Sequence, residues 1–142
     1  MKEVIVAYWS GTGNTAAMAA IIGKGVETAG VKAKVVSVEE FSASELKDCP
    51  VFALGCPSMG NEQLEETVME DFVTEVESFA SGKKIGLFGS YGWGDGEWMR
   101  NWVERMQAAG AEVLGGEDAI CMNEPDAEAE AKLEDLAKAL TV

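Results

Sequence analysis

Five short, mainly apolar runs recur along the chain, and segments of helix length separate most of them. A run without polar alternation is typical of a strand that is buried on both faces of a parallel sheet. Because parallel strands are joined by right-handed crossovers through helices, this order predicts an α/β fold with a doubly wound sheet of five parallel strands. The predicted strands are residues 4–8, 35–38, 51–55, 85–89 and 119–122.

Helical periodicity fills the intervals between these runs. In four of the intervals apolar residues recur every three or four positions, which predicts helices that pack one face on the sheet. Ser42 and Glu45 have the spacing of a capping box and predict a brief helix in the remaining interval. With no linker or repeat, residues 1–142 are expected to form a single domain. The periodic positions are Met18, Ile22 and Val26; Leu64, Val68, Phe72 and Val76; Trp98, Met99, Trp102 and Met106; and Leu133, Leu136, Ala137 and Leu140.

The charge balance excludes several classes of partner. The 11 Lys and Arg residues against 25 Asp and Glu residues give a net charge of −14, which disfavours nucleic acid and membrane surfaces and favours basic docking surfaces. Histidine is absent, which removes the commonest general base and metal ligand. Cys49, Cys56 and Cys121 form no C-x-x-C pair, so no metal site is predicted. We expect a cytoplasmic protein, since no segment resembles a targeting signal or a membrane span. We also expect it to be a monomer.

The first predicted strand ends in a loop that is rich in glycine and hydroxyl groups. Backbone N–H groups converge at such a turn, and the following helix adds partial positive charge, so an anion can bind without Lys or Arg. Helix capping alone is the alternative, although one cap residue satisfies that need. The residues are Ser10, Gly11, Thr12, Gly13, Asn14 and Thr15.

The pattern of this loop leaves more than one kind of phosphate ligand open. Residues 11–16 match the dinucleotide fingerprint G-x-G-x-x-A, and Glu39 and Glu40 follow the second strand, which favours a nicotinamide cofactor. A dinucleotide fold usually needs six strands, however, and the lysine of a triphosphate-binding P-loop is missing. Hydroxyl groups suit a terminal phosphate, so the pattern indicates a mononucleotide.

Two further loops follow the third and fourth strands. Trp93 lies among glycines, so its ring is free to stack on a planar ligand, while Trp98 and Trp102 share helical spacing and are expected in the core. In the other loop Met59 offers a thioether, Gly60 a freely rotating peptide and Glu62 a carboxylate, each suited to a flat heterocycle. An ordinary turn is the alternative interpretation of this second loop.

Together these loops resemble those of the flavodoxins, and the resemblance runs along the whole chain. Residues 10–15 are similar to the family's phosphate loop for flavin mononucleotide (FMN), 59–62 to its first ring-binding loop and 90–94 to its second. The stretch 111–122 is too short for the extra loop of long-chain members, so the similarity is to the short-chain type. The resemblance implies a flavodoxin-like sheet of strand order 2-1-3-4-5 and a non-covalent FMN.

The resemblance also implies individual roles. Met59 and Trp93 would cover opposite faces of the ring, and Glu62 would accept a hydrogen bond from its N3–H. The carbonyl of Gly60 would accept from the N5–H of the neutral semiquinone after the peptide turns over. The phosphate would be bound by Ser10, Thr12, Gly13, Asn14 and Thr15, and the expected contact set also includes Gly11, Ser58, Asn61, Ser90, Tyr91, Gly92 and Gly94.

The implied function is a low-potential one-electron carrier that cycles between semiquinone and hydroquinone and has no catalytic residues. Its partners would be reductase and acceptor enzymes. Seven acidic residues and no basic one lie between residues 61 and 77, which predicts either a docking surface for a basic partner or an ordinary solvated helix face. An FMN-dependent reductase remains an alternative. A phosphorelay receiver is disfavoured, because Tyr8-Trp9 and Gly55-Cys56 stand where it needs acidic residues.

Overall fold

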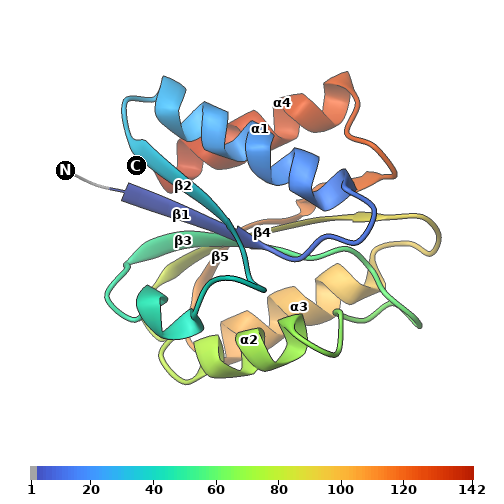
Figure 1. Cartoon of the computed structure of the whole chain (residues 1–142), viewed down its shortest axis with the longest axis horizontal. Helices are drawn as coiled ribbons and strands as arrows, with labels where there is room; N and C mark the ends of the chain where they lie inside the picture. Colours follow the sequence, from blue (N-terminus) through green and yellow to red (C-terminus); the bar gives the residue numbers. More distant parts are fainter. Residues whose placement is uncertain (1–2) are drawn as a thin grey trace.

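The computed structural model describes residues 3–142, in which four helices cover the two faces of a five-stranded sheet (Figure 1). The strand order is β2-β1-β3-β4-β5 and all neighbouring strands are parallel, which confirms the predicted α/β architecture. The elements are β1 (Glu3–Tyr8), α1 (Asn14–Thr28), β2 (Lys32–Ser37), a 3-10 helix (Ala43–Leu46), β3 (Val51–Gly55), α2 (Met69–Glu77), β4 (Lys84–Tyr91), α3 (Glu97–Ala108), β5 (Glu112–Met122) and α4 (Ala127–Leu140).

Strand β1 shows why the apolar runs are continuous. Val4 and Val6 belong to the core beneath α1 and α4, whereas Ile5 and Ala7 belong to the core beneath α2 and α3. Successive side chains of a strand point to opposite faces, and helices cover both faces of this sheet (Figure 1). Each strand residue therefore meets an apolar layer, whichever way it points.

Three of the four predicted helical faces are buried as expected, and the fourth needs a correction. The predicted core positions of α1, α3 and α4 are all buried. The helix predicted from Leu64 begins only at Met69, because the carboxylate of Glu65 accepts the N–H groups of Val68 and Met69 and fixes the helix start there. Leu64 is still buried, but in the preceding turns. Within residues 3–142, no helix has the length and hydropathy to cross a bilayer.

The capping box predicted for Ser42 and Glu45 is wrong, although the brief helix is there. The Ser42 hydroxyl lies 2.9 Å from that of Ser44 and makes no bond to the helix backbone. The backbone N–H of Glu45 instead donates to the Ser42 carbonyl over 3.1 Å. A 3-10 turn satisfies its first donors in this i to i+3 manner, so it does not need the serine side chain.

Two strands begin three or more residues before their predicted starts. The edge strand β2 begins at Lys32 and is only partly buried, so polar residues interrupt its apolar pattern. Strand β5 begins at Glu112, and its pairing with β4 shifts between Leu87 and Gly89. Near this bulge Gly115 and Gly116 have φ of 75° and 71°, left-handed values that suit glycine.

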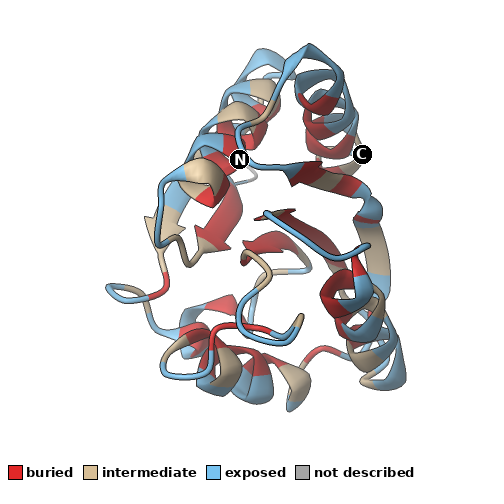
Figure 2. Cartoon of the chain, turned by 90° about the vertical axis from the view of Figure 1, so that its right-hand side faces the viewer, coloured by how far each residue is buried: buried red, intermediate tan, exposed pale blue. Residues whose placement is uncertain are grey.

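Because the sheet is parallel, the carboxyl ends of all strands meet at one edge. This edge lies on the right of Figure 1 and faces the viewer in Figure 2. The loops that follow β1, β3 and β4 come together there. In an open α/β sheet, ligands bind at this edge, outside the carboxyl ends of the strands.

Candidate cofactor site

A cleft of about 240 Å³ opens where the three loops meet. No acidic residue is among those that line it, although the whole chain contains 25. The lining also includes three residues that were not predicted: Trp9, Pro57 and Asn123. The predicted residues that lie outside the lining are Ser10, Gly13, Thr15, Gly60, Asn61, Glu62, Trp93 and Gly94. The predicted residues that do are Gly11, Thr12, Asn14, Ser58, Met59, Ser90, Tyr91 and Gly92.

The turn at residues 10–15 presents donors at the start of α1. The Ser10 hydroxyl accepts the N–H groups of Gly13 and Ala16 at 3.1 and 3.3 Å, so this serine caps the turn from inside. The N–H groups of Asn14 and Thr15 have no protein acceptor within residues 3–142. Free donors and the helix dipole together favour an anion at this point, and this donor set fits a phosphate monoester.

A buried pair of hydroxyl groups connects this turn to β4. Thr15 Oγ1 lies 3.1 Å from Ser90 Oγ, and both residues are almost fully buried. The bond fixes the start of α1 against the end of β4. Two residues predicted as cofactor contacts are therefore engaged with each other.

The loop after β3 closes into a tight turn. The N–H of Met59 donates to the carbonyl of Gln63 at 2.8 Å, and the reverse bond is 2.9 Å long. Gly60 and Glu62 take left-handed backbone conformations, with φ of 53° and 52°. For Glu62 this conformation costs roughly 1–2 kcal/mol, because its Cβ crowds the backbone. The turn leaves the Met59 side chain exposed beside the cleft.

The Glu62 carboxylate binds the start of α3. Its Oε1 accepts the backbone N–H of Glu97 over 2.9 Å, at the first residue of α3. The carboxylate also packs against Gly94. The structure therefore places this residue between the two predicted ring loops rather than in the lining of the cleft.

The three tryptophans of the second half of the chain divide as predicted between surface and core. Trp93 is 60% exposed at the tip of its loop, whereas Trp98 and Trp102 are each 1% exposed. The indole N–H of Trp98 donates to the Cys56 carbonyl over 3.1 Å. The exposed Trp93 indole and the exposed Met59 side chain are two large apolar groups, on two of the loops at this edge, that a planar ligand could cover. Trp9, whose place the pattern left open, lines the cleft.

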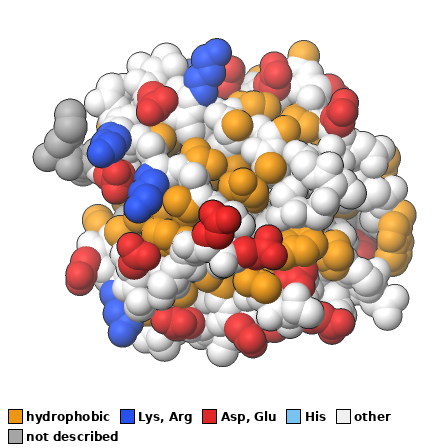
Figure 3. Space-filling view, viewed as in Figure 1, with side chains coloured by type: hydrophobic (Ala, Val, Ile, Leu, Met, Phe, Trp, Pro, Cys, Tyr) orange, Lys and Arg blue, Asp and Glu red, His pale blue; other side chains and the backbone are white. Residues whose placement is uncertain are grey.

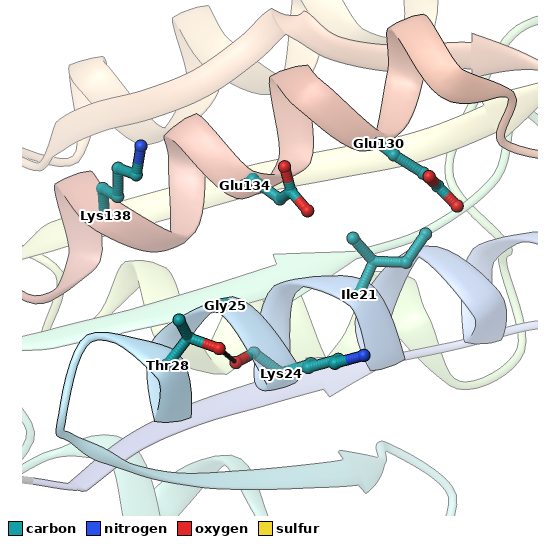
Figure 4. A pocket seen from close by; sticks show the side chains of 7 residues that line it. All are labelled: Ile21, Lys24, Gly25, Thr28, Glu130, Glu134 and Lys138. Atoms are coloured by element: carbon teal, nitrogen blue, oxygen red, sulfur yellow. Dashed lines mark hydrogen bonds between the residues drawn. The ribbon is translucent and has the colours of Figure 1, made fainter.

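A larger hollow of about 390 Å³ lies elsewhere, between α1 and α4 (Figure 4). Its walls carry Lys24 and Lys138 together with Glu130 and Glu134, so its charges are mixed. All of its lining residues lie inside the two helices, whose backbone N–H groups are already bonded within the helix. It therefore lacks the free backbone donors of the cleft at the strand ends.

Part of the acidic segment at residues 61–77 is bound internally. Arg105 on α3 donates to Glu70 at 2.6 and 2.9 Å and to Glu77 at 2.8 Å, which ties α3 to α2. Hydrogen bonding to Arg105 lowers the pKa of Glu70, and the same bond, with that to Glu77, raises the pKa of Arg105. Since Glu62 and Glu65 are also engaged, the acids left without a side-chain partner among the described residues are Glu66, Asp71 and Glu75.

The three cysteines are structural thiols. All are free, and Cys56 and Cys121 are buried. Burial raises the pKa of the Cys56 thiol to about 12, so it stays protonated at neutral pH. Its sulfur accepts the N–H of Glu65 over 3.4 Å, which helps to hold the loop after β3.

Glu65 should make the stability of the protein depend on pH. Burial alone would raise its pKa, but hydrogen bonds from the Thr67 hydroxyl and from the backbone N–H groups of Met69, Val68 and Thr67 lower it to about 2. Because the folded pKa lies below the ordinary value of 4.5, the carboxylate stabilises the fold above about pH 4.5 and this contribution disappears as the pH falls toward 2. Glu65→Gln should therefore lower the free energy of unfolding by about 2 kcal/mol at pH 7, as a lost helix cap does.

Urea denaturation at several pH values checks this expectation. The difference between the parent protein and Glu65→Gln should shrink between pH 4.5 and pH 2. Glu66→Gln removes the same charge from the exposed neighbouring position and should change stability by less than about 0.5 kcal/mol. A difference that stayed constant over this pH range would contradict the assignment of the low pKa to Glu65.

The strand order and the position of the cleft together define the class of protein. This is a doubly wound α/β protein whose ligand site lies where the strand order reverses, beside β1 and β3. A family model described as Flavodoxin matches residues 6–139. The chain belongs to the flavodoxin family.

Individual relatives agree with this assignment. The flavodoxin of Megasphaera elsdenii is 46% identical over 132 residues, which cover 93% of each chain. The flavodoxin of Clostridium beijerinckii is 46% identical over 121 residues, covering 85% of this chain and 87% of the relative. The solution structure of two-electron reduced Megasphaera elsdenii flavodoxin superimposes with a TM-score of 0.82 at 42% identity, covering 95% of this chain and 98% of the other.

Membership of this family gives the general function. The protein is an FMN-binding electron-transfer protein, and it acts as an electron carrier rather than as an enzyme. As a carrier it exchanges electrons with other redox proteins.

Proposed function

We propose that the cleft at the carboxyl edge binds FMN non-covalently, with its phosphate at the turn of residues 10–15 and its ring between Met59 and Trp93. The observation that carries this proposal is the pair of free N–H groups of Asn14 and Thr15 at the start of α1, next to an acid-free cleft on a protein of charge −14. A dianionic phosphate is repelled by carboxylates, so their exclusion from the lining marks the place for it. When bound, FMN supplies one-electron redox chemistry.

The residues of the chain then have distinct tasks. Thr12 lines the cleft with a hydroxyl that can donate to a phosphate oxygen. Met59 and Trp93 cover the ring faces and keep water from them. Gly60, already in a left-handed conformation at the tip of its turn, can reorient its peptide toward the ring without a Cβ penalty.

The surface around the cleft suits a basic redox partner. On the face shown in Figure 3, the Lys and Arg side chains lie on the left and near the middle of the top, and the right-hand end, where the strands finish, shows none. Free carboxylates follow on the chain after β3, at Glu66 in the loop and at Asp71 and Glu75 on α2. We place the carrier in the cytoplasm as a monomer that docks transiently, without nucleic acid or membrane partners, and its free thiols suit that reducing compartment.

Absorption spectroscopy of the purified protein tests the proposal. The protein should be yellow, release FMN on denaturation as identified by mass spectrometry, and accept two electrons in separate one-electron steps during anaerobic titration. It should need a separate reductase, because NADPH alone should not reduce it. A colourless protein that takes up no added FMN, or one that NADPH reduces directly, would contradict the proposal.

Neutralising the free acids of the loop after β3 and of α2 should raise the lower redox potential. The triple variant Glu66→Gln, Asp71→Asn and Glu75→Gln should raise the more negative one-electron potential by roughly 50 mV, because each carboxylate repels the electron added last. Potentiometric titration at low ionic strength measures this shift, which added salt should reduce.

A matched triple variant controls for the change in total charge. Glu27→Gln, Asp48→Asn and Glu112→Gln removes three exposed acids near the edge where the strands begin. This variant should shift the potential by less than about 15 mV, since screening weakens interactions over such distances. Equal shifts in both variants would show that net charge, rather than the position of the acids in the loop and on α2, sets the potential.

A further inference from the structure

Strand β2 forms one end of the sheet and pairs with β1 alone among the described strands. The N–H of Val38, directly after β2, donates to the Tyr8 carbonyl of β1 over 2.9 Å. Since the backbone groups of successive strand residues point to opposite sides, Lys34 also faces β1, whereas Ala33 and Val35 face outward. Within residues 3–142, the outward N–H and C=O groups of Ala33 and Val35 have no hydrogen-bond partner. The edge therefore presents a row of unpaired peptide groups.

The opposite end of the sheet is protected in a way that β2 is not. A bulge interrupts the pairing of β5 with β4, and β5 carries Glu112, Glu117 and Asp118. Such a bulge twists an edge strand away from a regular partner. Strand β2, by contrast, keeps an uninterrupted register with β1 over all 6 of its residues. A regular edge with free peptide groups is a template for one more strand.

One face of the β2 edge is apolar. A Cβ built on Gly23 of α1 would lie 2.6 Å from Val35 Cγ2 and 3.9 Å from Ala33 Cβ, so both side chains lie against α1. Between α1 and β2 is a hollow of about 350 Å³, whose lining also includes Lys24 and Glu27. Val35 remains 40% exposed there. An apolar side chain of an added strand, placed beside Val35, would cover this surface.

The other face of the edge is basic. Lys32 and Lys34 point away from α1, because side chains alternate along a strand, and the Lys34 Nζ lies 5.5 Å from the centroid of the Phe41 ring. Lys32 lies 3.6 Å from Glu3, whereas Lys34 has no carboxylate partner among residues 3–142. Strand β2 carries two lysines and no acid, on a protein of net charge −14. This edge is therefore a local basic surface that suits acidic side chains.

We propose that β2 binds an extended segment of a partner protein in which acidic residues alternate with β-branched apolar residues. The segment continues the sheet by hydrogen bonding to the outward groups of Ala33 and Val35. Its acidic side chains then lie on the face of Lys32 and Lys34, and its apolar ones beside Val35, because both strands share a period of two. No residue of β2 lines the FMN cleft, so this surface is independent of the proposed function.

NMR titration of the isotope-labelled protein, as purified, with the peptide acetyl-Glu-Val-Glu-Val-Glu-amide tests the proposal. The pattern of this peptide is the same in both directions, so it fits a parallel or an antiparallel added strand. In about 0.1 M salt, where charges more than about 10 Å away are screened, the amide signals of Ala33 and Val35 should shift in a saturable way. The peptide with lysine in place of glutamate should bind about tenfold more weakly.

Two variants separate the backbone and charge contributions. Val35→Pro removes an outward N–H but none that faces β1, a position where an edge strand tolerates proline, and it should abolish saturable binding. Lys34→Gln should weaken binding roughly fivefold. The matched control is Lys132→Gln, which removes a lysine beside β5 at the opposite end of the sheet and should leave the affinity within about twofold. If the proline variant does not fold, Lys34→Gln decides.

Three results would overturn the proposal. Absence of shifts at Ala33 and Val35, or equal binding of the lysine peptide, would show that Lys32 and Lys34 serve only to keep other strands away from the edge. Equal affinity in Lys34→Gln and Lys132→Gln would contradict the charge complementarity. Signals of β2 that move when the protein alone is diluted would show pairing with a second copy instead of with a partner.

Discussion

Replacement of Thr12 by Asp should weaken FMN binding about 100-fold, or by roughly 3 kcal/mol. Thr12 lines a cleft that has no acidic side chain and no Lys or Arg. A carboxylate there would face a phosphate that carries nearly two negative charges. At a separation of about 5 Å and an effective dielectric constant near 40, their repulsion alone amounts to roughly 3 kcal/mol. Titration of the apoprotein with FMN, followed by quenching of flavin fluorescence, gives the dissociation constant.

Two variants make the outcome interpretable. Thr12→Val removes the hydroxyl without adding charge and should weaken binding only about tenfold, as expected for one hydrogen bond to a charged group. Ser44→Asp adds the same charge at an exposed position of the 3-10 helix, away from the cleft, and should leave the dissociation constant within twofold. If Thr12→Asp bound FMN as tightly as the parent, the phosphate would lie elsewhere.

Gly89→Ala should cost about 3 kcal/mol of folding free energy or more, the largest effect on stability that we expect from adding one carbon. A Cβ on Gly89 would lie 2.1 Å from the carbonyl oxygen of Cys56 and 3.1 Å from the Trp98 ring. The oxygen belongs to the backbone and accepts the Trp98 indole N–H, so it cannot move aside without losing that bond. Urea denaturation should show a lower transition midpoint.

Gly92→Ala supplies the comparison within the same segment. Only Asn123 Oδ1 lies within 4 Å of a Cβ built there, at 3.8 Å, and the backbone conformation suits any residue. Its free energy of unfolding should stay within about 0.5 kcal/mol of the parent value. Equal losses in the two variants would show that glycine flexibility in this loop, rather than the close approach at Gly89, is what the fold requires.

The architecture was predictable because both of its signals are local. An uninterrupted apolar run and a helical repeat can each be identified within a dozen residues, and each corresponds to an element here. The prediction was incomplete where tertiary structure intervenes. The start of α2 depends on the side chain of Glu65, and the first half of β5 contains a bulge whose two glycines interrupt the apolar pattern.

The site was predictable to a similar degree. The three loops were identified because glycine, hydroxyl and aromatic residues are unusual together at strand ends. What the pattern could not indicate was direction: Glu62 points to α3, and Arg105 binds two acids that lie 28 and 35 positions earlier. Asn123 could have been suggested by its place directly after the last strand, which ends at the same edge as the others.

Because no Lys or Arg lines the cleft, FMN binding and partner docking should respond differently to ionic strength. Neutral N–H and hydroxyl donors release no condensed ions when they bind a phosphate, so added salt does not compete with the cofactor. Salt instead screens the repulsion between a dianion and a protein of charge −14, which favours retention of FMN. Encounter with the basic partner proposed above should weaken under the same conditions. A rise in salt concentration should therefore release the partner while the flavin stays bound.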